Sequence, residues 1–362
     1  MILGFGEIMM RVAPAGQHRL RQALPGMVQV TWGGGEANVC VSLAILGQPS
    51  RYVTALPATP ITASLVATLR GLGVDTGHIR FTKNGRLGIY FLETGANQRS
   101  SVVVYDREGS AIALARPDHY DFAAALDGVT WAHVTGITPA LSENAFRSTL
   151  ALVKLAKERQ RTVSCDLNFR KKLWHWRAGT KPAALARECL TQILPFVDLV
   201  IANEEDAHDV LGIAAAGTSV EAGRINAAAY ETVARQIVRQ FPNVSRVAIT
   251  LRESVSADHN NWGGLLFDAK LDRAFFAPLA DDGRYQPYEI RDIVDRVGGG
   301  DSFGAGLIYA LHSETYRDPA SAIRFAVAAS CLKHSIVGDF NYATADEVAA
   351  LLQGGGSGRV KR

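Results

Sequence analysis

Residues 297–306 read Val297–Gly298–Gly299–Gly300–Asp301–Ser302–Phe303–Gly304–Ala305–Gly306, three glycines and an acid at the start of a run of small residues. Consecutive glycines let backbone N–H groups face a ligand because no Cβ intervenes, and a helix N-terminus adds partial positive charge. The run therefore suits a phosphate group. A phosphate repels a carboxylate, so Asp301 is unexpected at such a site unless it has a chemical role. Accepting a proton from an attacking hydroxyl is such a role, and the pattern therefore predicts phosphoryl transfer.

The same turn has a simpler interpretation as an ordinary helix start. Asp301 or Ser302 would then be the N-cap of a stable helix. The residues that follow favour the functional interpretation, because Gly304 and Gly306 each cost about 1 kcal/mol relative to alanine in a helix. A close approach of backbone or ligand explains them better than helix stability does.

The composition describes a globular chain with a small net charge. The 362 residues are 48% hydrophobic and 20% charged, which is enough for one large α/β domain or two smaller ones. The net charge of +3, with scattered Lys and Arg, favours neither nucleic acid nor a membrane as a partner. No apolar run approaches the roughly 20 residues of a membrane span, and no secretory signal follows Met1.

The cysteines suggest a cytoplasmic protein. Cys40, Cys165, Cys189 and Cys331 lie far apart and lack zinc-binding spacing. We therefore expect buried thiols in a reducing compartment.

Short apolar runs alternate with amphipathic stretches along the chain. The predicted strands are Ile2–Ile8, Ser50–Thr54, His133–Thr135, Thr162–Leu167, Asp198–Ala202 and Arg246–Leu251. The predicted helices are Ala37–Leu46, Ala63–Leu72, Glu143–Arg159, Glu204–Leu211 and Ala227–Gln240, with mostly helix from Asp301 onward. This alternation predicts a mainly parallel sheet with helices on both faces. We expect one domain over residues 1–353.

Two segments interrupt the alternation and predict a small second sheet. Gly88–Glu93 and Ser101–Tyr105 flank a polar turn and indicate a β-hairpin, for which Val28–Trp32 is a candidate partner. The lid segments would lie near residues 10–32 and 86–112. A projecting sheet beside a ligand site is a candidate lid that keeps water from an activated phosphate.

Two glycine-rich stretches have no periodic pattern. Ala214–Gly223 is predicted to be a surface loop, and residues 354–362 a flexible tail.

A second glycine cluster, Gly33–Gly34–Gly35–Glu36–Ala37–Asn38, opens an earlier helix, and no P-loop is present. Together with Asp295–Asp301, this cluster resembles the two motifs of the PfkB (ribokinase-like) carbohydrate kinases. These motifs are Gly-Gly-x-x-x-Asn near the N-terminus and Asp-x-x-Gly-x-Gly-Asp near the C-terminus. The resemblance covers nearly the whole chain. It implies a ribokinase-like fold, ATP and Mg²⁺ as cofactors, and a monovalent cation such as K⁺ as a further candidate.

Further segments resemble the 2-keto-3-deoxygluconate kinase branch of that family. They are Gly6–Met9, Tyr105–Ala111, Gly136–Leu141 and Asp166–Trp174. The resemblance implies that Gly33, Gly34, Asn38, Tyr90, Tyr105, Arg107, Arg170 and Asp301 bind the substrate. A sugar acid carries a carboxylate, which a guanidinium binds bidentately. Without the family, Arg107 would be interpreted as a solvated loop charge and Arg170 as a surface ion pair with Asp166.

For the nucleotide, Asn203–Glu204–Glu205–Asp206 resembles the family's Asn-x-x-Glu motif, with Asp in place of the last Glu. Either Glu205 or Asp206 is therefore implied as the acid that meets Mg²⁺ through water. The expected ATP-binding residues are Asn203, Arg252, Ser254, Gly298 and Gly300. The chain departs from the family pattern at residues 55–60 and 250–256. Arg296 stands where the family has Thr or Pro.

The resemblance implies ATP-dependent phosphorylation of the 6-hydroxyl of 2-keto-3-deoxygluconate. Asp301 would be the general base, and the N–H groups of Gly298, Gly299 and Gly300 would stabilise the transferred phosphoryl. The alternatives are a kinase of keto-deoxygalactonate, fructose, ribose or a nucleoside, or a catalytically silent sugar-acid sensor. By analogy with lid hairpins in such kinases, a homo-oligomer is expected.

Overall fold

A computed structural model describes residues 1–203, 205–213 and 227–354. The predicted loop Ala214–Gly223 and most of the predicted tail lie outside these residues. Within them, no helix is long and apolar enough to cross a membrane.

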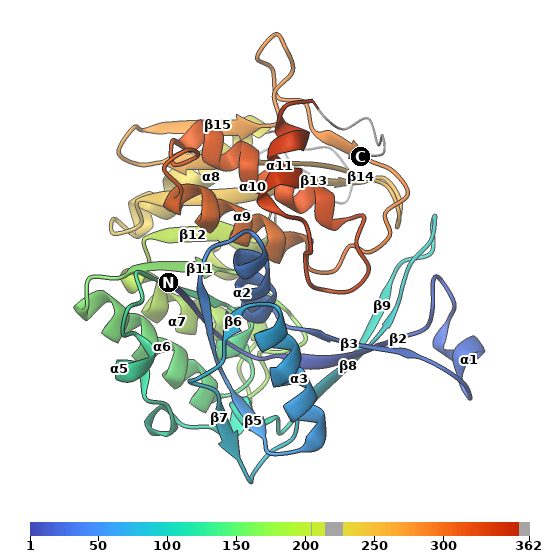
Figure 1. Cartoon of the computed structure of the whole chain (residues 1–362). Coiled ribbons are helices and arrows are strands. Elements are labelled where there is room, and N and C mark those ends of the chain that lie inside the picture. The colour runs from blue at the N-terminus through green and yellow to red at the C-terminus, as the bar shows by residue number, and fades with distance from the viewer. Residues whose placement is uncertain (204, 214–226, 355–362) are drawn as a thin grey trace.

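The core is a ten-stranded sheet of order β15-β14-β13-β12-β11-β10-β1-β4-β6, with β16 paired to β14 (Figure 1). Its strands are β1 (Ile2–Phe5), β4 (Ser50–Val53), β6 (Val74–Asp75), β10 (Trp131–Thr135), β11 (Thr162–Asp166), β12 (Leu199–Ala202), β13 (Arg246–Ser254), β14 (Asn260–Asp268), β15 (Arg273–Ala277) and β16 (Tyr288–Ile290). The pairings from β6 to β13 are parallel, and those of β14 with β13, β15 and β16 are antiparallel. The mainly parallel sheet is therefore confirmed, with an antiparallel extension that the sequence did not indicate.

Helices cover both faces of this sheet (Figure 1). The longer ones are α2 (Gly35–Ile45), α3 (Pro60–Gly71), α6 (Glu143–Glu158), α7 (Pro182–Ile193), α8 (Ala227–Gln240), α9 (Gly299–His312), α10 (Pro319–Lys333) and α11 (Ala345–Leu352). The short ones are α1 (Leu20–Ala23), α4 (Ala111–Leu114), α5 (Phe122–Ala125), η1 (Pro117–His119), η2 (Thr138–Ala140), η3 (Leu194–Phe196) and η4 (Ala207–Leu211). Of the predicted helix Glu204–Leu211, the structure shows a single wider turn, the π-helix η4.

Successive side chains of β13 pack under helices on opposite faces of the sheet. Val247 and Ile249 belong to the core cluster under α6, α7 and α8, whereas Ala248 belongs to the cluster under α9 and α10. Because successive side chains of a strand point to opposite faces, a strand buried on both faces is continuously apolar.

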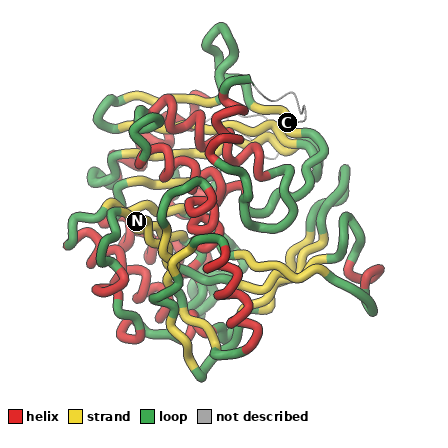
Figure 2. Tube along the Cα trace, viewed as in Figure 1, coloured by secondary structure: helices red, strands yellow, loops and turns green. Residues whose placement is uncertain are grey.

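A separate four-stranded sheet of order β3-β2-β8-β9 projects from the core (Figures 1 and 2). Its strands are β2 (Met9–Ala13), β3 (Gln29–Gly33), β8 (Gly88–Glu93) and β9 (Val102–Asp106), and a third, two-stranded sheet joins β5 (Ala55–Pro57) to β7 (Arg80–Thr82). The hairpin β8–β9 is antiparallel as predicted. The pairing of Val28–Trp32 with that hairpin is wrong: β3 pairs with β2, and β2 lies between β3 and β8. Arg11 interrupts the apolar pattern of β2 and conceals it in the sequence.

The glycines of α9 allow a close helix contact. A Cβ at Gly306 would lie 3.0 Å from the Cα of Ala326 and 3.0 Å from the Cβ of Ala329, both on α10. The small-residue run therefore serves helix packing at this position.

We expect Gly306→Ala to lower the free energy of unfolding by about 1–3 kcal/mol, because the added methyl overpacks the contact between α9 and α10. Gly71→Ala, at the end of α3 where a Cβ would meet nothing within 4 Å, is the matched control. That change should be neutral or stabilising by up to about 1 kcal/mol. Urea denaturation of both variants checks this, and equal effects would contradict the packing argument.

Candidate active site

The two glycine clusters open two helices whose first turns face each other. Gly34 is the N-cap of α2 and Gly298 the N-cap of α9. A Cβ at Gly34 would lie 2.1 Å from the carbonyl oxygen of Glu7. Gly298 has φ 82°, and a Cβ there would lie 2.1 Å from the carbonyl oxygen of Asp339. Only glycine fits both turns, because the neighbouring backbone comes too close for a side chain.

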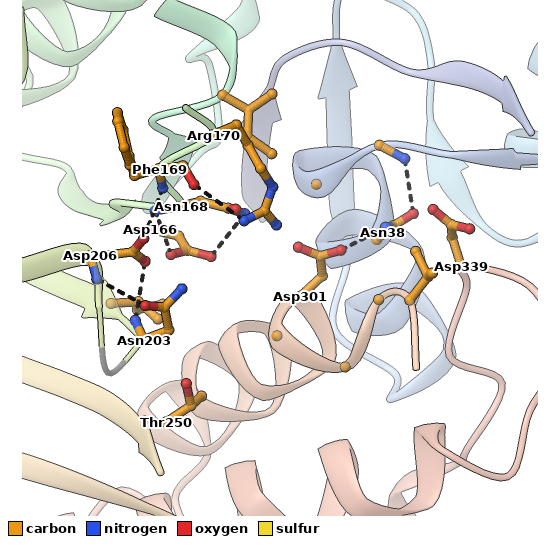
Figure 3. Close-up of a pocket in the computed structure, with 18 of the residues that line it drawn as sticks. Asn38, Asp166, Asn168, Phe169, Arg170, Asn203, Asp206, Thr250, Asp301 and Asp339 are labelled. Carbon is orange, nitrogen blue, oxygen red and sulfur yellow. Dashed lines mark hydrogen bonds between the residues drawn. The ribbon is translucent and has the colours of Figure 1, made fainter. Parts of the chain in front are cut away.

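Asn38 and Asp301, one from each helix, are hydrogen-bonded (Figure 3). The Nδ2 of Asn38 donates to Oδ2 of Asp301 at 2.6 Å, while the N–H of Gly34 donates to Oδ1 of Asn38 at 3.2 Å. The backbone thus determines which way the amide faces. Asn38, expected to contact a sugar, lines the cavity and also orients the candidate base.

Burial raises the pKa of Asp301 to about 6. The hydrogen bond from Asn38 opposes this shift, the charge of Asp339 adds to it, and Arg170 and Lys333 lower the pKa again. The carboxylate is therefore ionised at neutral pH and has a proton affinity close to that of a good general base.

A cavity of about 470 Å³ lies in front of these two turns. Most of the residues expected to bind sugar or nucleotide line it: Gly34, Asn38, Tyr90, Tyr105, Arg107, Arg170, Asn203, Glu205, Asp206, Arg252, Gly298, Gly299, Gly300 and Asp301. Gly33 and Ser254 are not among its lining residues. A Cβ at Gly33 would overlap the carboxylate of Asp339, so this glycine makes room for a buried acid.

Tyr90 and Tyr105 come from the small sheet, and Arg107 directly follows its strand β9. Nε of Arg107 donates to Oε2 of Glu7 at 2.7 Å, and Nη2 donates to the same oxygen. Nη1 takes no part in these two contacts, and the guanidinium lies 5.3 Å from the centre of the Tyr105 ring. The hydroxyl of Tyr90 donates to Oδ1 of Asp339 at 2.5 Å, so it is the Tyr90 ring that faces the cavity.

Arg170 reaches into the cavity between Asp166 and Asp301 (Figure 3). Its side chain is exposed, and Nη1 donates to the carbonyl oxygen of Phe169 at 3.4 Å. Burial raises the pKa of Asp166, the charges of Asp206 and Asp301 add to the rise, and Arg170 opposes it. Arg170 is therefore a cation among carboxylates at the cavity surface, available to an anionic ligand.

On the nucleotide side, Asn203 and Asp206 hold two loops together. Oδ1 of Asn203 accepts from the N–H groups of Glu205 and Asp206 at 2.8 and 2.9 Å. The carboxylate of Asp206, which is 3% exposed, accepts from the N–H groups of Phe169 at 3.0 Å and Asn203 at 3.2 Å. Burial raises its pKa. Asp206 is thus engaged with the backbone, whereas Glu205 is exposed at the cavity.

Two further arginines line the same cavity near the glycine turn, Arg252 and Arg296. Nη2 of Arg296 donates to Oγ of Ser254 at 3.3 Å and to Oδ1 of Asn260 at 3.4 Å. Both arginines help to lower the pKa of His334, behind burial as the main cause. Ser254 therefore contributes by anchoring Arg296.

Sequence reasoning missed four acids that line the cavity: Glu7, Asp166, Asp209 and Asp339. Asp166 begins the segment Asp166–Asn168–Arg170 and could have been identified from it. Glu7 lies in the segment Gly6–Met9 and could have been identified from it as well. Asp339 has no local signal, because its partner Tyr90 lies 249 residues away in the chain.

Comparison with known proteins agrees with this geometry. The family described as "pfkB family carbohydrate kinase" matches residues 1–241, about two thirds of the chain. The chain belongs to this family. It is accordingly a sugar kinase with the ribokinase-like fold.

Two relatives resemble this pfkB kinase over nearly their full lengths. The crystal structure of 2-dehydro-3-deoxygluconokinase from Thermotoga maritima is 40% identical, with a TM-score of 0.86, covering 97% of this chain and 99% of that one. A 2-dehydro-3-deoxygalactonokinase from Haloferax volcanii is 29% identical over 99% of this chain and 98% of its own. A third relative, a 2-dehydro-3-deoxygluconokinase from Thermoproteus tenax, is 27% identical over 84% of this chain and 80% of its own.

We expect kcat/KM of this pfkB kinase to fall about tenfold per pH unit below about pH 6, as Asp301 becomes protonated and can no longer accept a proton. Asn38→Leu removes the hydrogen bond that favours the carboxylate, so the acid limb should move to higher pH by about one unit. The pH dependence of kcat/KM measures both.

Asn144→Leu, at the start of α6, is the matched control and should leave the limb at about pH 6. An unchanged limb in the Asn38 variant would show that another group controls it.

Proposed function

We propose that this kinase transfers the γ-phosphoryl group of ATP to the 6-hydroxyl of 2-keto-3-deoxygluconate, forming 2-keto-3-deoxy-6-phosphogluconate. One observation carries the proposal: the half-buried Asp301 at the glycine turn shares a cavity with Arg107 and Arg170. A sugar acid uses both features, because its hydroxyl needs a base and its carboxylate needs a cation. A neutral sugar needs only the first.

In the proposed reaction Asp301 accepts the proton of the 6-hydroxyl while the new oxygen–phosphorus bond forms. The bond between the γ-phosphorus and the bridging oxygen breaks, and ADP leaves with the electron pair. The N–H groups of Gly298 and Gly300, at the N-terminus of α9, would face the developing negative charge, whereas the N–H of Gly299 donates to the carbonyl oxygen of Arg296 at 3.4 Å. Asn38 keeps the Asp301 carboxylate aimed at the hydroxyl.

The sugar acid would lie over Gly34 and Asn38, with the rings of Tyr90 and Tyr105 along its side. Nη1 of Arg107 and the guanidinium of Arg170 would receive its carboxylate. We do not assign a sugar contact to Gly33, because it packs against Asp339. The sugar end of the cavity is thus defined by the small sheet on one side and by the loop after β11 on the other.

Kinases of the pfkB type use ATP and Mg²⁺. We assign the phosphates to Gly298, Gly300, Arg252 and Asn203, with Ser254 acting through Arg296. In the described part of the chain, no three Asp, Glu, His or Cys side chains form a metal cluster. Mg²⁺ typically keeps several waters and binds phosphates plus one or two carboxylates, so Glu205 fits a water-mediated contact better than Asp206. When bound, Mg²⁺ would neutralise charge on the phosphates.

The galactonate-derived acid is a second candidate substrate. The relative from Haloferax volcanii, which matches nearly the whole chain, is named for it. The two acids differ only in configuration at C4. Both would present the same carboxylate and the same terminal hydroxyl to Arg107, Arg170 and Asp301.

A homo-oligomer remains a prediction, and so does a place in the cytoplasm. The exposed valines of the small sheet, Val30, Val102 and Val104, support association of two copies through this sheet. All four cysteines are free thiols, which fits a reducing compartment.

Asp301→Asn should lower kcat by about 10²–10⁴-fold while ATP still binds, because the shape is kept and the proton acceptor is lost. Coupled ADP release measures turnover, and calorimetry measures ATP binding. Asp346→Asn, in the first turn of α11, is the matched control and should retain full activity. Substantial turnover by the Asp301 variant would remove Asp301 as the base.

A screen of ADP release tests the substrate class. It compares the keto-deoxy acids derived from gluconate and galactonate with fructose, ribose and adenosine. We expect one or both acids to give the highest kcat/KM. Arg170→Ala should lower that value about 10–100-fold on the acids, the loss typical of a hydrogen bond to a charged group, and change it little on any neutral sugar that reacts.

Arg147→Ala is the control for this screen, because Arg147 lies on the exposed face of α6, where it pairs with Glu143. It should leave kcat/KM unchanged on every substrate. Equal losses on acids and neutral sugars in the Arg170 variant would contradict its role as the carboxylate ligand.

A further inference from the structure

Lys333, the last residue of α10, is fully buried. A buried ammonium is costly unless it is paired, so its partners indicate its purpose. Its Nζ donates to the carbonyl oxygen of Ile336 at 3.0 Å and to that of Asp295 at 3.5 Å. One oxygen belongs to the loop after α10, and the other to the turn that leads into α9. The ammonium therefore joins two separate backbone segments.

These two segments support the glycine turn of the active site. The N–H groups of Val294 and Asp295 donate to the carbonyl oxygen of His334 at 2.9 and 3.3 Å. The N–H of Gly338 donates to Oδ2 of Asp295 at 3.0 Å, and Gly298 packs directly against the carbonyl of Asp339. A shift of the loop relative to Asp295 would therefore displace the turn that begins at Gly298.

The junction concentrates negative charge and carbonyl oxygens. Burial lowers the pKa of Lys333, but the carboxylates of Asp295, Asp339 and Asp301 favour its charged form. Arg11 neutralises the carboxylate side through contacts of 2.5 Å with Asp295 and 2.9 Å with Asp339. Lys333 supplies the positive charge on the carbonyl side, near the C-terminus of α10, where a helix favours a cation.

The family resemblance raised K⁺ as a candidate cofactor. Potassium is bound in proteins by converging backbone carbonyl oxygens, which is the kind of ligand found at this junction. Here the ammonium of Lys333 already contacts two of these oxygens, and it would repel a second cation at the same place. The residues at the junction therefore do not fit a K⁺ ion.

We propose that the Lys333 ammonium replaces a monovalent metal ion in this kinase. It holds the carbonyl groups of Asp295 and Ile336 together and thereby positions the N–H groups of Gly298 and Gly300 for the transferred phosphoryl. Lys333 is a positioning residue, and turnover needs no added K⁺. The inference rests on the proposed role of the glycine turn in phosphoryl transfer.

The wild-type enzyme provides the first test. Initial rates are compared at constant ionic strength with Na⁺, K⁺, NH₄⁺ or tetramethylammonium as the sole monovalent cation. We expect kcat to vary by less than about twofold among them, a difference too small to indicate a lost transition-state contact. Activation by K⁺ of about fivefold or more over tetramethylammonium would overturn the proposal, whether or not any variant folds.

Two variants provide the second test. Lys333→Met keeps the volume without the charge and should lower kcat about tenfold or more, with a much smaller change in KM for the sugar. Lys333→Ala leaves space for an ion, so K⁺ or NH₄⁺ should restore part of its kcat in a saturable way, and tetramethylammonium should not. Lys157→Ala removes a lysine paired with Asp198 outside the site and should show neither effect.

A folded Lys333→Ala variant that is slow and indifferent to every cation would assign the lysine to packing alone and overturn the proposal. So would a variant with full activity in tetramethylammonium. The comparison uses whichever sugar the screen finds to be phosphorylated. A wrong sugar assignment and a wrong assignment of Lys333 therefore give different results.

Discussion

Two buried carboxylates, Asp295 and Asp339, and the cations that neutralise them hold together the parts of the molecule that form the site. Arg11 from β2 contacts both acids, and Lys333 lies close to them at the end of α10. Charges removed from water cost several kcal/mol each unless they are paired with good geometry. Segments more than 280 residues apart in the chain are therefore restricted to one arrangement, in which the small sheet and the glycine turn meet.

This arrangement organises the cavity before any ligand binds. Tyr90 donates to Asp339, so its ring is held at the cavity wall, and Gly298 packs against the backbone of the same acid. On the opposite side, Asn38 holds the carboxylate of Asp301 in place. Groups that are already oriented need little reorganisation when charge develops on a transferred phosphoryl, which is the main source of electrostatic catalysis. The proton affinity of Asp301 and the positions of the N–H donors thus follow from the same buried contacts.

Several side chains have functions that differ from what their motif alone indicated. Asn38 was expected to bind sugar, but its amide also orients Asp301. Arg107 was expected to bind a carboxylate, and two of its nitrogens contact Glu7. Asp206 completes the acidic motif in sequence, yet its carboxylate accepts from two backbone N–H groups while Glu205 is exposed. In each case the motif identified the correct region, and a partner from another segment defined what the side chain contacts.

The sequence by itself determined the alternation of strands and helices, a helix after each glycine cluster, and the hairpin β8–β9, because these depend on local periodicity and on glycine. The two helices begin at Gly35 and Gly299, before the expected Ala37 and Asp301, and Gly298 is the N-cap in place of Asp301 or Ser302. The sequence did not reveal β14, where Asn260–Gly264 breaks the apolar pattern, or the place of β2 between β3 and β8. Only the tertiary structure decided these strand pairings. It alone also decided which groups Arg11 and Lys333 contact. Strand order and charge pairing depend on contacts between segments far apart in the chain, which no local pattern records.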